Sequence, residues 1–193
     1  MRKSKWYLSG MVSLACLLIA VGILIHTPSA NAAGNFLVGT GIYDITGPAA
    51  ECGMMGWFMA DQKTEGINTR LRSRAFVVVD PVSGKRVVLV IADAGMIPQG
   101  INQAVVKKLV SKYNGLYTDK NVTISATHTH SAPGAMSHYA LYNLSMFGYD
   151  EKHFNTVAEG IYQSIVRAHN NLKPGNIRIN TGELDNCGWN RSP

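Results

Sequence analysis

Two histidines, His128 and His130, lie one residue apart at the end of a strand-like segment, NVTISATHTHSAPG (121–134). Neutral imidazole is the commonest protein ligand of zinc, and a catalytic zinc ion takes about three protein ligands and keeps one position for water. The pair therefore predicts part of a metal site whose other ligands come from elsewhere in the chain. The same spacing also occurs where each ring only bonds a backbone carbonyl. The spacing alone leaves both interpretations open.

The segment that precedes these histidines has the pattern of a β-strand. Side chains at alternate positions share one face of a strand. Here the shared row is Val122, Ile124, Ala126, His128 and His130. We expect this row to be apolar inside a sheet and to end in imidazoles at the carboxyl edge, where open α/β sheets bind ligands. A tight turn at Ser131–Gly134 would leave both rings at the mouth of a site.

Other residues are weaker candidates for chemistry. Asp93 directly follows the apolar run VVLVIA (87–92), and a carboxylate at a strand end can orient a ligating imidazole through its second nitrogen. A capping or loop-bonding aspartate fits the same position. His153 and His169 lie among polar neighbours on predicted helices, so we expect them at the surface. The methionine-rich segment 53–59 suits contact with an acyl chain, but equally an ordinary core or a flexible lid.

Strand-like and helix-like segments alternate along the chain, which predicts an α/β fold of layered sheets flanked by helices. Arg74–Asp80 and Arg86–Ala92 are short, β-branched and almost continuously apolar, so we expect two strands covered on both faces. Pro81–Gly84 supplies the turn of a hairpin between them. The alternating residues Ile177 and Ile179 predict a further strand near the end of the chain.

Two amphipathic helices are predicted. From Gln99 to Tyr113 apolar residues recur every four positions and lysines occupy the other side, and Asn114-Gly115 ends the pattern. A second helix is expected from Glu151 to Asn170, with Asp150 as its N-cap. No internal repeat or low-complexity linker divides residues 33–193, so we expect one domain or part of one.

Composition narrows the class of protein. The chain has 193 residues, 46% of them hydrophobic and 16% charged, which is the balance of a folded domain. The formal charge of +6 falls to +3 without Arg2, Lys3 and Lys5. No stretch interleaves basic and aromatic residues as a nucleic-acid surface would, so we expect no nucleic-acid partner. The alternating arginines at 70, 72 and 74 predict one solvated or ion-paired strand face.

The N-terminus has the pattern of an export signal. A basic start precedes an apolar run from about Met11 to Ile25 and the small-residue stretch Ala30–Ala32, which predicts a signal peptide over 1–32 and a secreted protein, extracellular or periplasmic. An uncleaved membrane anchor is the alternative. Outside this segment only Cys52 and Cys187 remain, and the sequence leaves open whether they pair.

Several separated motifs together resemble one family. They are SATHTHSAPG (125–134), GINTRLRSRAFVV (66–78), IADAGM (91–96), LKPGNIRINTGELD (172–185) and NRSP (190–193). In this order and at this spacing they resemble the N-terminal catalytic region of neutral ceramidases, over 36–193. These are secreted or membrane-associated zinc amidases that cleave ceramide into sphingosine and a fatty acid. The resemblance implies a ceramide or other sphingolipid substrate and transient contact with a membrane surface.

The resemblance also assigns residues. It implies that His128 binds zinc, that His130 acts at the reacting centre without being a primary ligand, and that Arg191 lines the substrate pocket. The family's other zinc ligands are a later histidine, a glutamate and a tyrosine. They and an essential serine segment have no counterpart in this sequence, and neither has the family's C-terminal immunoglobulin-like domain. We therefore expect residues 33–193 to be the N-terminal part of a larger zinc-hydrolase domain, inactive alone.

Two other functions remain open at this stage. One is a metallohydrolase of the same superfamily that acts on another amide or an ester. The other is a secreted lipid-binding module without catalysis. A comparison of ceramide with other substrates distinguishes the first from a ceramidase. The zinc stoichiometry distinguishes the second, because a binding module needs no metal.

Overall fold

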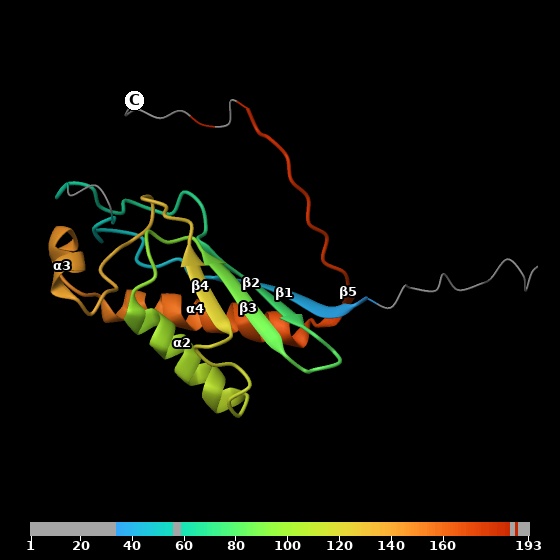
Figure 1. The fold of residues 1–193 in the computed structure, drawn as a ribbon. Coiled ribbons are helices and arrows are strands. Elements are labelled where there is room, and N and C mark those ends of the chain that lie inside the picture. The colour runs from blue at the N-terminus through green and yellow to red at the C-terminus, as the bar shows by residue number, and fades with distance from the viewer. Residues whose placement is uncertain (1–33, 56–58, 186–187, 189–193) are drawn as a thin grey trace, which may run out of the picture. The chain divides into compact units, whose positions relative to one another are not determined.

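The chain forms one mixed sheet and two long helices in a computed structural model, which describes residues 34–55, 59–185 and 188 (Figure 1). Along the chain the elements are β1 (Phe36–Asp44), β2 (Arg72–Val79), β3 (Arg86–Ala92), α2 (Gln99–Lys112), β4 (Val122–Ala126), α3 (Ala140–Asn143), the 3-10 turn η1 (Leu144–Met146), α4 (Glu151–Asn170) and β5 (Lys173–Gly175). This alternation of strands and helices confirms the predicted α/β class.

The sheet has the order β4-β3-β2-β1-β5. All its neighbouring strands are antiparallel except β3 and β4, which run parallel from Val88↔Val122 to Ala92↔Ala126. Helix α2 makes the crossover between these two strands, as a parallel pair requires. The parallel pair brings the ends of β3 and β4 to the same edge, next to the segment that carries the histidines.

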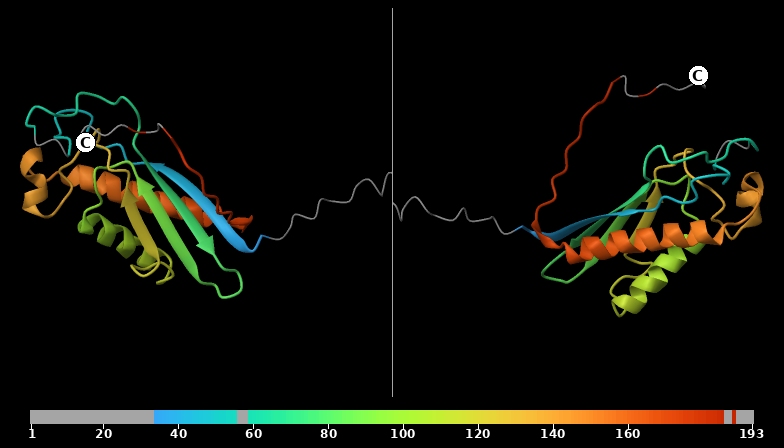
Figure 2. Two further views of the ribbon diagram at one scale, coloured as in Figure 1. Left: turned by 45° about the horizontal axis from the view of Figure 1, so that its top comes forward. Right: turned by 180° about the vertical axis from the view of Figure 1, so that it is seen from behind.

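Both long helices cover the same face of the sheet (Figure 2). Alternate side chains of β2 and β3, among them Val77, Val88 and Val90, are buried in one apolar core with side chains of α4 and α2. The residues between them, Phe76, Val87, Leu89 and Ile91, are exposed on the other face. The expectation that these strands are covered on both faces is therefore wrong for the described residues. An apolar run only shows that both faces avoid polar side chains, and it does not show what covers each face.

Strand β1 was not predicted, because glycines interrupt its apolar pattern. Gly39 and Gly41 lie where the backbone of α4 crosses the strand: a Cβ at Gly41 would lie 2.1 Å from Ser164 O, and one at Gly39 would lie 2.0 Å from Ala168 O. Glycine is depleted in strands, but inside a strand it marks a close approach of another backbone. The two glycines thus allow α4 to pack directly on β1.

Most predicted elements have the expected boundaries. Helix α4 begins and ends at the predicted residues, and the Asp150 carboxylate accepts from His153 N at 2.9 Å as an N-cap. Asn114 (φ 50°) and Gly115 (φ 81°) end α2 in the left-handed conformation, as the sequence indicated. The strand predicted around Ile177 and Ile179 is wrong: β5 ends at Gly175, and these side chains are exposed in a segment outside any strand.

Candidate functional site

His128 and His130 lie just beyond the carboxyl end of β4, at the shared edge of β3 and β4. The ladder continues for one residue past the strand, because Thr127 N donates to Ala92 O at 2.9 Å. The chain then turns at His128, whose φ of 61° is left-handed and rare for a residue with a side chain. The predicted strand row therefore stops at Ala126, and the turn, not strand alternation, brings the two rings together. Such unusual backbone geometry concentrates at functional sites.

The geometry fixes the tautomer of His128. Its Nδ1 lies 2.7 Å from the carbonyl oxygen of Gly95, in the turn that follows β3. A carbonyl oxygen only accepts, so Nδ1 carries the proton and Nε2 of the neutral ring keeps its lone pair. The Nε2 atoms of His128 and His130 lie 3.4 Å apart, with ring centroids separated by 4.9 Å. Both rings thus present Nε2 to the same space.

His128 fits a zinc ligand by this arrangement. Metal-ligating histidines almost always donate their second N–H to a carbonyl or carboxylate, which orients the ring and raises its basicity. Gly95 O accepts such a bond from His128 here, and the sequence gives no sign of it because a backbone acceptor has no residue signature. Within 34–55, 59–185 and 188 no three His, Cys, Asp or Glu side chains lie close enough to hold a metal ion. These residues supply one oriented donor and no complete ligand set.

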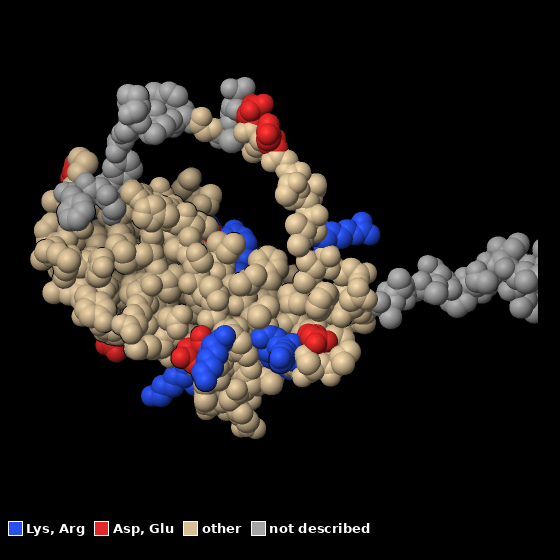
Figure 3. Space-filling view, viewed as in Figure 1, with Lys and Arg blue, Asp and Glu red and all other residues tan. Residues whose placement is uncertain are grey.

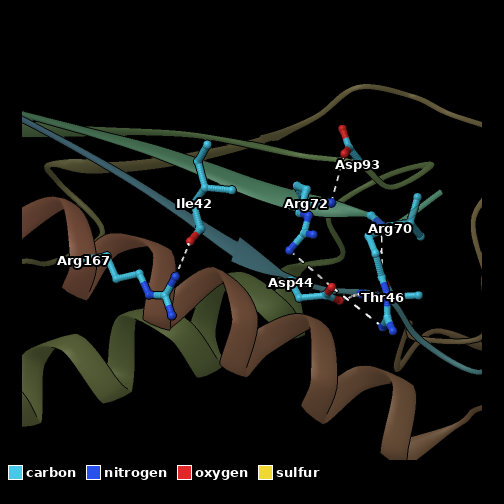
Figure 4. A network of polar contacts seen from close by, with 8 residues as sticks. Ile42, Asp44, Thr46, Arg70, Arg72, Asp93 and Arg167 are labelled. Atoms are coloured by element: carbon cyan, nitrogen blue, oxygen red, sulfur yellow. Dashed lines mark hydrogen bonds and ion pairs between the residues drawn. The ribbon is translucent and has the colours of Figure 1, made fainter.

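Asp93 accepts hydrogen bonds from two arginines of β2, while the His128 ring that it could have oriented bonds Gly95 O. Its Oδ2 accepts from Arg72 N at 2.9 Å, and its Oδ1 accepts from Arg74 Nη1 at 2.8 Å. Figure 4 shows the bond to Arg72, and also Arg70 and Arg72 beside Asp44, with N–O distances of 3.8 and 3.3 Å. The carboxylate of Asp93 thus joins β2 to the turn after β3. The alternating arginines form ion pairs, which confirms the solvated or ion-paired face.

The turn after the histidines is fixed by hydrogen bonds from three directions. Gly134 N donates to Gly53 O at 2.8 Å, and Asp150 N donates to Ala135 O at 2.7 Å. The third bond comes from α4: the Nε2 atom of His153 lies 3.1 Å from Pro133 O, and it donates because a carbonyl oxygen can only accept. Helix α4 therefore fixes the backbone position of the segment that carries His130.

The prediction of a surface position for His153 and His169 is wrong. His153 is 2% exposed, and His169 is half-buried with its Nδ1 2.7 Å from Tyr117 Oη. Gly47 leaves the space for the His153 ring: a Cβ there would lie 2.0 Å from Nδ1. Polar neighbours along a helix gave the wrong expectation, because His153 lies on the side of the first turn that faces the loops.

The stability of the protein should decrease as the pH falls below about 6.5 because of these two histidines. Burial lowers the pKa of His153, although Pro133 O and Asp150 act in the opposite direction, and burial followed by Arg86 and Lys112 lowers the pKa of His169. The unfolded chain, with histidine pKa near 6.5, then binds more protons than the folded one. The contribution of these two histidines to the free energy of unfolding is therefore complete above pH 6.5. It decreases as the pH falls toward their lowered folded-state pKa values.

Urea unfolding at a series of pH values measures this effect. His153→Gln keeps an N–H for Pro133 O and removes the titration, so its stability should change less across this window than that of the unmodified protein. His169→Gln, measured in parallel, gives the contribution of the second ring. A parent protein with equal stability at pH 5 and 6.5 would contradict the assignment. Carboxylates with lowered pKa, such as Glu159, act below this window.

A pocket of about 290 Å³ adjoins the histidine pair through Ser131 and Pro133. Gly66–Thr69 and Met54 also line this pocket. Met54 forms a β-bridge with Pro133, so the beginning of segment 53–59 packs on the turn of the site. Residues 56–58, in the middle of that segment, lie outside the described residues.

Arg191, Cys187 and the predicted signal peptide all fall outside the residues that the structure describes. The pocket role of Arg191, the pairing of Cys52 with Cys187 and the cleavage after Ala32 therefore stay predictions. Within the described parts of the chain, no helix is both long and apolar enough to span a bilayer.

The fold and the site together define an α/β domain that carries a pair of histidines at the carboxyl edge of its sheet. The chain belongs to the neutral/alkaline non-lysosomal ceramidases: the model of the family's N-terminal region matches residues 36–193. Neutral ceramidase from Pseudomonas aeruginosa is 46% identical over 179 residues, 93% of this chain and 26% of that protein. Neutral ceramidase 3 from Arabidopsis thaliana is 48% identical over 159 residues, 82% of this chain and 22% of that protein.

The fold agrees with a solved structure of the family. The crystal structure of the Pseudomonas aeruginosa neutral ceramidase matches with a TM-score of 0.71 and 50% identity, over 72% of this chain and 22% of that chain. The chain thus spans between 22% and 26% of the length of these relatives. The predicted resemblance to neutral ceramidases is confirmed.

Proposed function

We propose that this chain supplies the histidine side of a zinc-dependent active site that hydrolyses the N-acyl bond of ceramide to sphingosine and a fatty acid. Family membership over 36–193 supports the substrate class. The observation that carries the metal assignment is the bond between His128 Nδ1 and Gly95 O at 2.7 Å, because it leaves Nε2 as an oriented lone-pair donor. A bound zinc ion would lower the pKa of a water molecule and polarise the amide carbonyl.

The residues of this chain have distinct roles in the proposal. His128 holds the metal. The Nε2 atom of His130, 3.4 Å from that of His128, is placed to bond the developing oxyanion or to give a proton to the departing amine. Arg191 bonds the polar head of the sphingoid base. Water adds across the amide bond, so the carbonyl carbon becomes a carboxylic acid and the nitrogen leaves as the amine of sphingosine.

Hydrolysis of a long-chain ceramide by the native-length protein tests this function. We expect release of sphingosine, loss of activity after treatment with a strong zinc chelator, and recovery on adding Zn²⁺. Residues 1–193 alone should bind zinc weakly and be inactive, since one imidazole does not complete a zinc site. We also propose that the protein is exported, and N-terminal sequencing of secreted material checks cleavage after Ala32.

The same assay separates the alternatives. A native-length protein that cleaves another amide or an ester and leaves ceramide intact would be a hydrolase of different specificity. One that binds ceramide without metal and without turnover would be a lipid-binding module. Either result would overturn the proposed activity.

A further inference from the structure

A compact apolar surface surrounds the short helix α3 and the turn η1. We call it the α3 patch; it consists of Tyr139, Leu141, Tyr142, Leu144, Phe147 and Tyr149, all exposed. Leu141 is 71% exposed and Phe147 is 69% exposed. Residues 139–149 include no charged side chain. In Figure 3, the end of the molecule that carries α3 is accordingly almost free of blue and red.

Buried side chains hold the backbone of the patch in place. Asn143 in α3 is buried, and its Nδ2 donates to Ser137 O at 2.5 Å. Met146 is buried beneath the patch, against Gly53 and Gly134. The exposed side chains are therefore presented by a turn that a buried hydrogen bond and a buried methionine hold in place. They do not belong to an unfolded loop, and the cost of ordering them is already met in the fold.

A layer of methionines connects the patch to the histidine site. Met55, Met96, Met136 and Met146 line a narrow gap together with Tyr142 of the patch. The Met55 side chain also lies beside Gly95, whose carbonyl oxygen accepts from His128. Methionine side chains adapt to apolar ligands of varied shape. The patch is thus continuous, through apolar side chains, with the site where the proposed reaction occurs.

A second apolar space opens within the patch itself. Leu144, Phe147, Tyr149 and His138 line a pocket of about 520 Å³. The Lys63 ammonium lies 6.0 Å from the centre of the ring of Phe147, one of these lining residues. Apolar side chains in such a lining suit an alkyl chain.

We propose that the α3 patch is the surface through which the protein docks on a lipid bilayer. This inference rests on the proposed function, because ceramide has two alkyl chains and resides in bilayers. Leucine and phenylalanine side chains would bury their apolar surface among the acyl chains. Tyrosine suits the boundary with the headgroups, because it has an apolar ring and a polar hydroxyl. The absence of charge in 139–149 avoids the cost of desolvating an ion. Apolar burial and not charge attraction drives this docking.

Flotation with phosphatidylcholine vesicles, without ceramide, tests the docking in the native-length protein. The double variant Leu141→Asn, Leu144→Asn should bind at least about tenfold more weakly, since two exposed leucines lose their transfer into lipid. The matched control is Val82→Asn, because Val82 is 95% exposed in the β2–β3 turn and distant in sequence from the patch. The control should bind as the parent does.

Two further measurements separate docking from catalysis. The double variant should lose activity on ceramide in vesicles and keep it on a short-chain ceramide dispersed as monomers. Unchanged flotation of the double variant would overturn the proposal. A large loss of thermal stability would also overturn it, because it would show that protein and not lipid covers the patch. Vesicle binding is measured without turnover, so a failure of the proposed amidase activity leaves this test interpretable.

Discussion

Replacing His128 with alanine should lower ceramide hydrolysis by the native-length protein more than about 100-fold and release its zinc. Loss of an outer-shell partner alone costs about 10- to 100-fold in metal affinity or activity, so loss of a ligand should cost more. The Nδ1–Gly95 O bond of 2.7 Å holds this ring in place, and alanine offers neither the donor nor the orientation. Turnover and the zinc content of purified protein are measured on the same sample.

Two other histidine variants make this result specific. His130→Ala should keep the zinc and still lose about 100-fold in turnover, because its proposed role is to the oxyanion or the leaving amine. His169→Gln removes an imidazole that bonds Tyr117 on the helix side of the sheet, and it should retain both metal and activity. Full zinc content and full activity in His128→Ala would show that this ring only bonds protein groups.

Gly41→Ala should lower the free energy of unfolding by about 3 kcal/mol, at the upper end of the cost of overpacking. A Cβ at this position would lie 2.1 Å from Ser164 O and 2.5 Å from Ala168 N, which are backbone atoms of α4. Backbone atoms inside a helix cannot rotate away as a side-chain end can. The helix must therefore move off β1, which would also loosen the buried pair Ser73 Oγ–Ser164 Oγ, 2.9 Å apart.

Chemical denaturation of the variant and the parent protein measures this difference. Gly182→Ala is the matched control, since a Cβ there would meet nothing within 4 Å. The control should change stability by only a few tenths of a kcal/mol, as surface substitutions do. A Gly41→Ala protein as stable as the parent would show that α4 does not pack on β1 as closely as described.

The elements with a clear hydrophobic period could be predicted from the sequence, and those shaped by tertiary contact could not. Helix α4 was found to the residue because its apolar stripe and its Asp150 cap agree. Strand β1 is not predicted, because its glycines make room for the backbone of α4, which is distant in the sequence. Only three-dimensional packing reveals that role.

The same division holds for the site. The histidine pair was visible as residue types, and its location at the carboxyl edge of β4 followed from the strand pattern. The left-handed turn at His128 and the acceptor Gly95 O were not visible, because both are properties of the backbone. The buried position of His153 depends on the space that Gly47 leaves, which sequence neighbours do not indicate.

The packing of α4 on β1 has a consequence for synthesis on the ribosome. Gly41 in β1 is translated about 120 residues before Ser164, its neighbour in α4, which at ~5–20 residues per second is a delay of roughly 6–25 s. Strand β5, which pairs with β1 at Phe36↔Gly175, is translated later still. Strand β1 must therefore wait for helix α4 during synthesis, and chaperones have that interval in which to bind it.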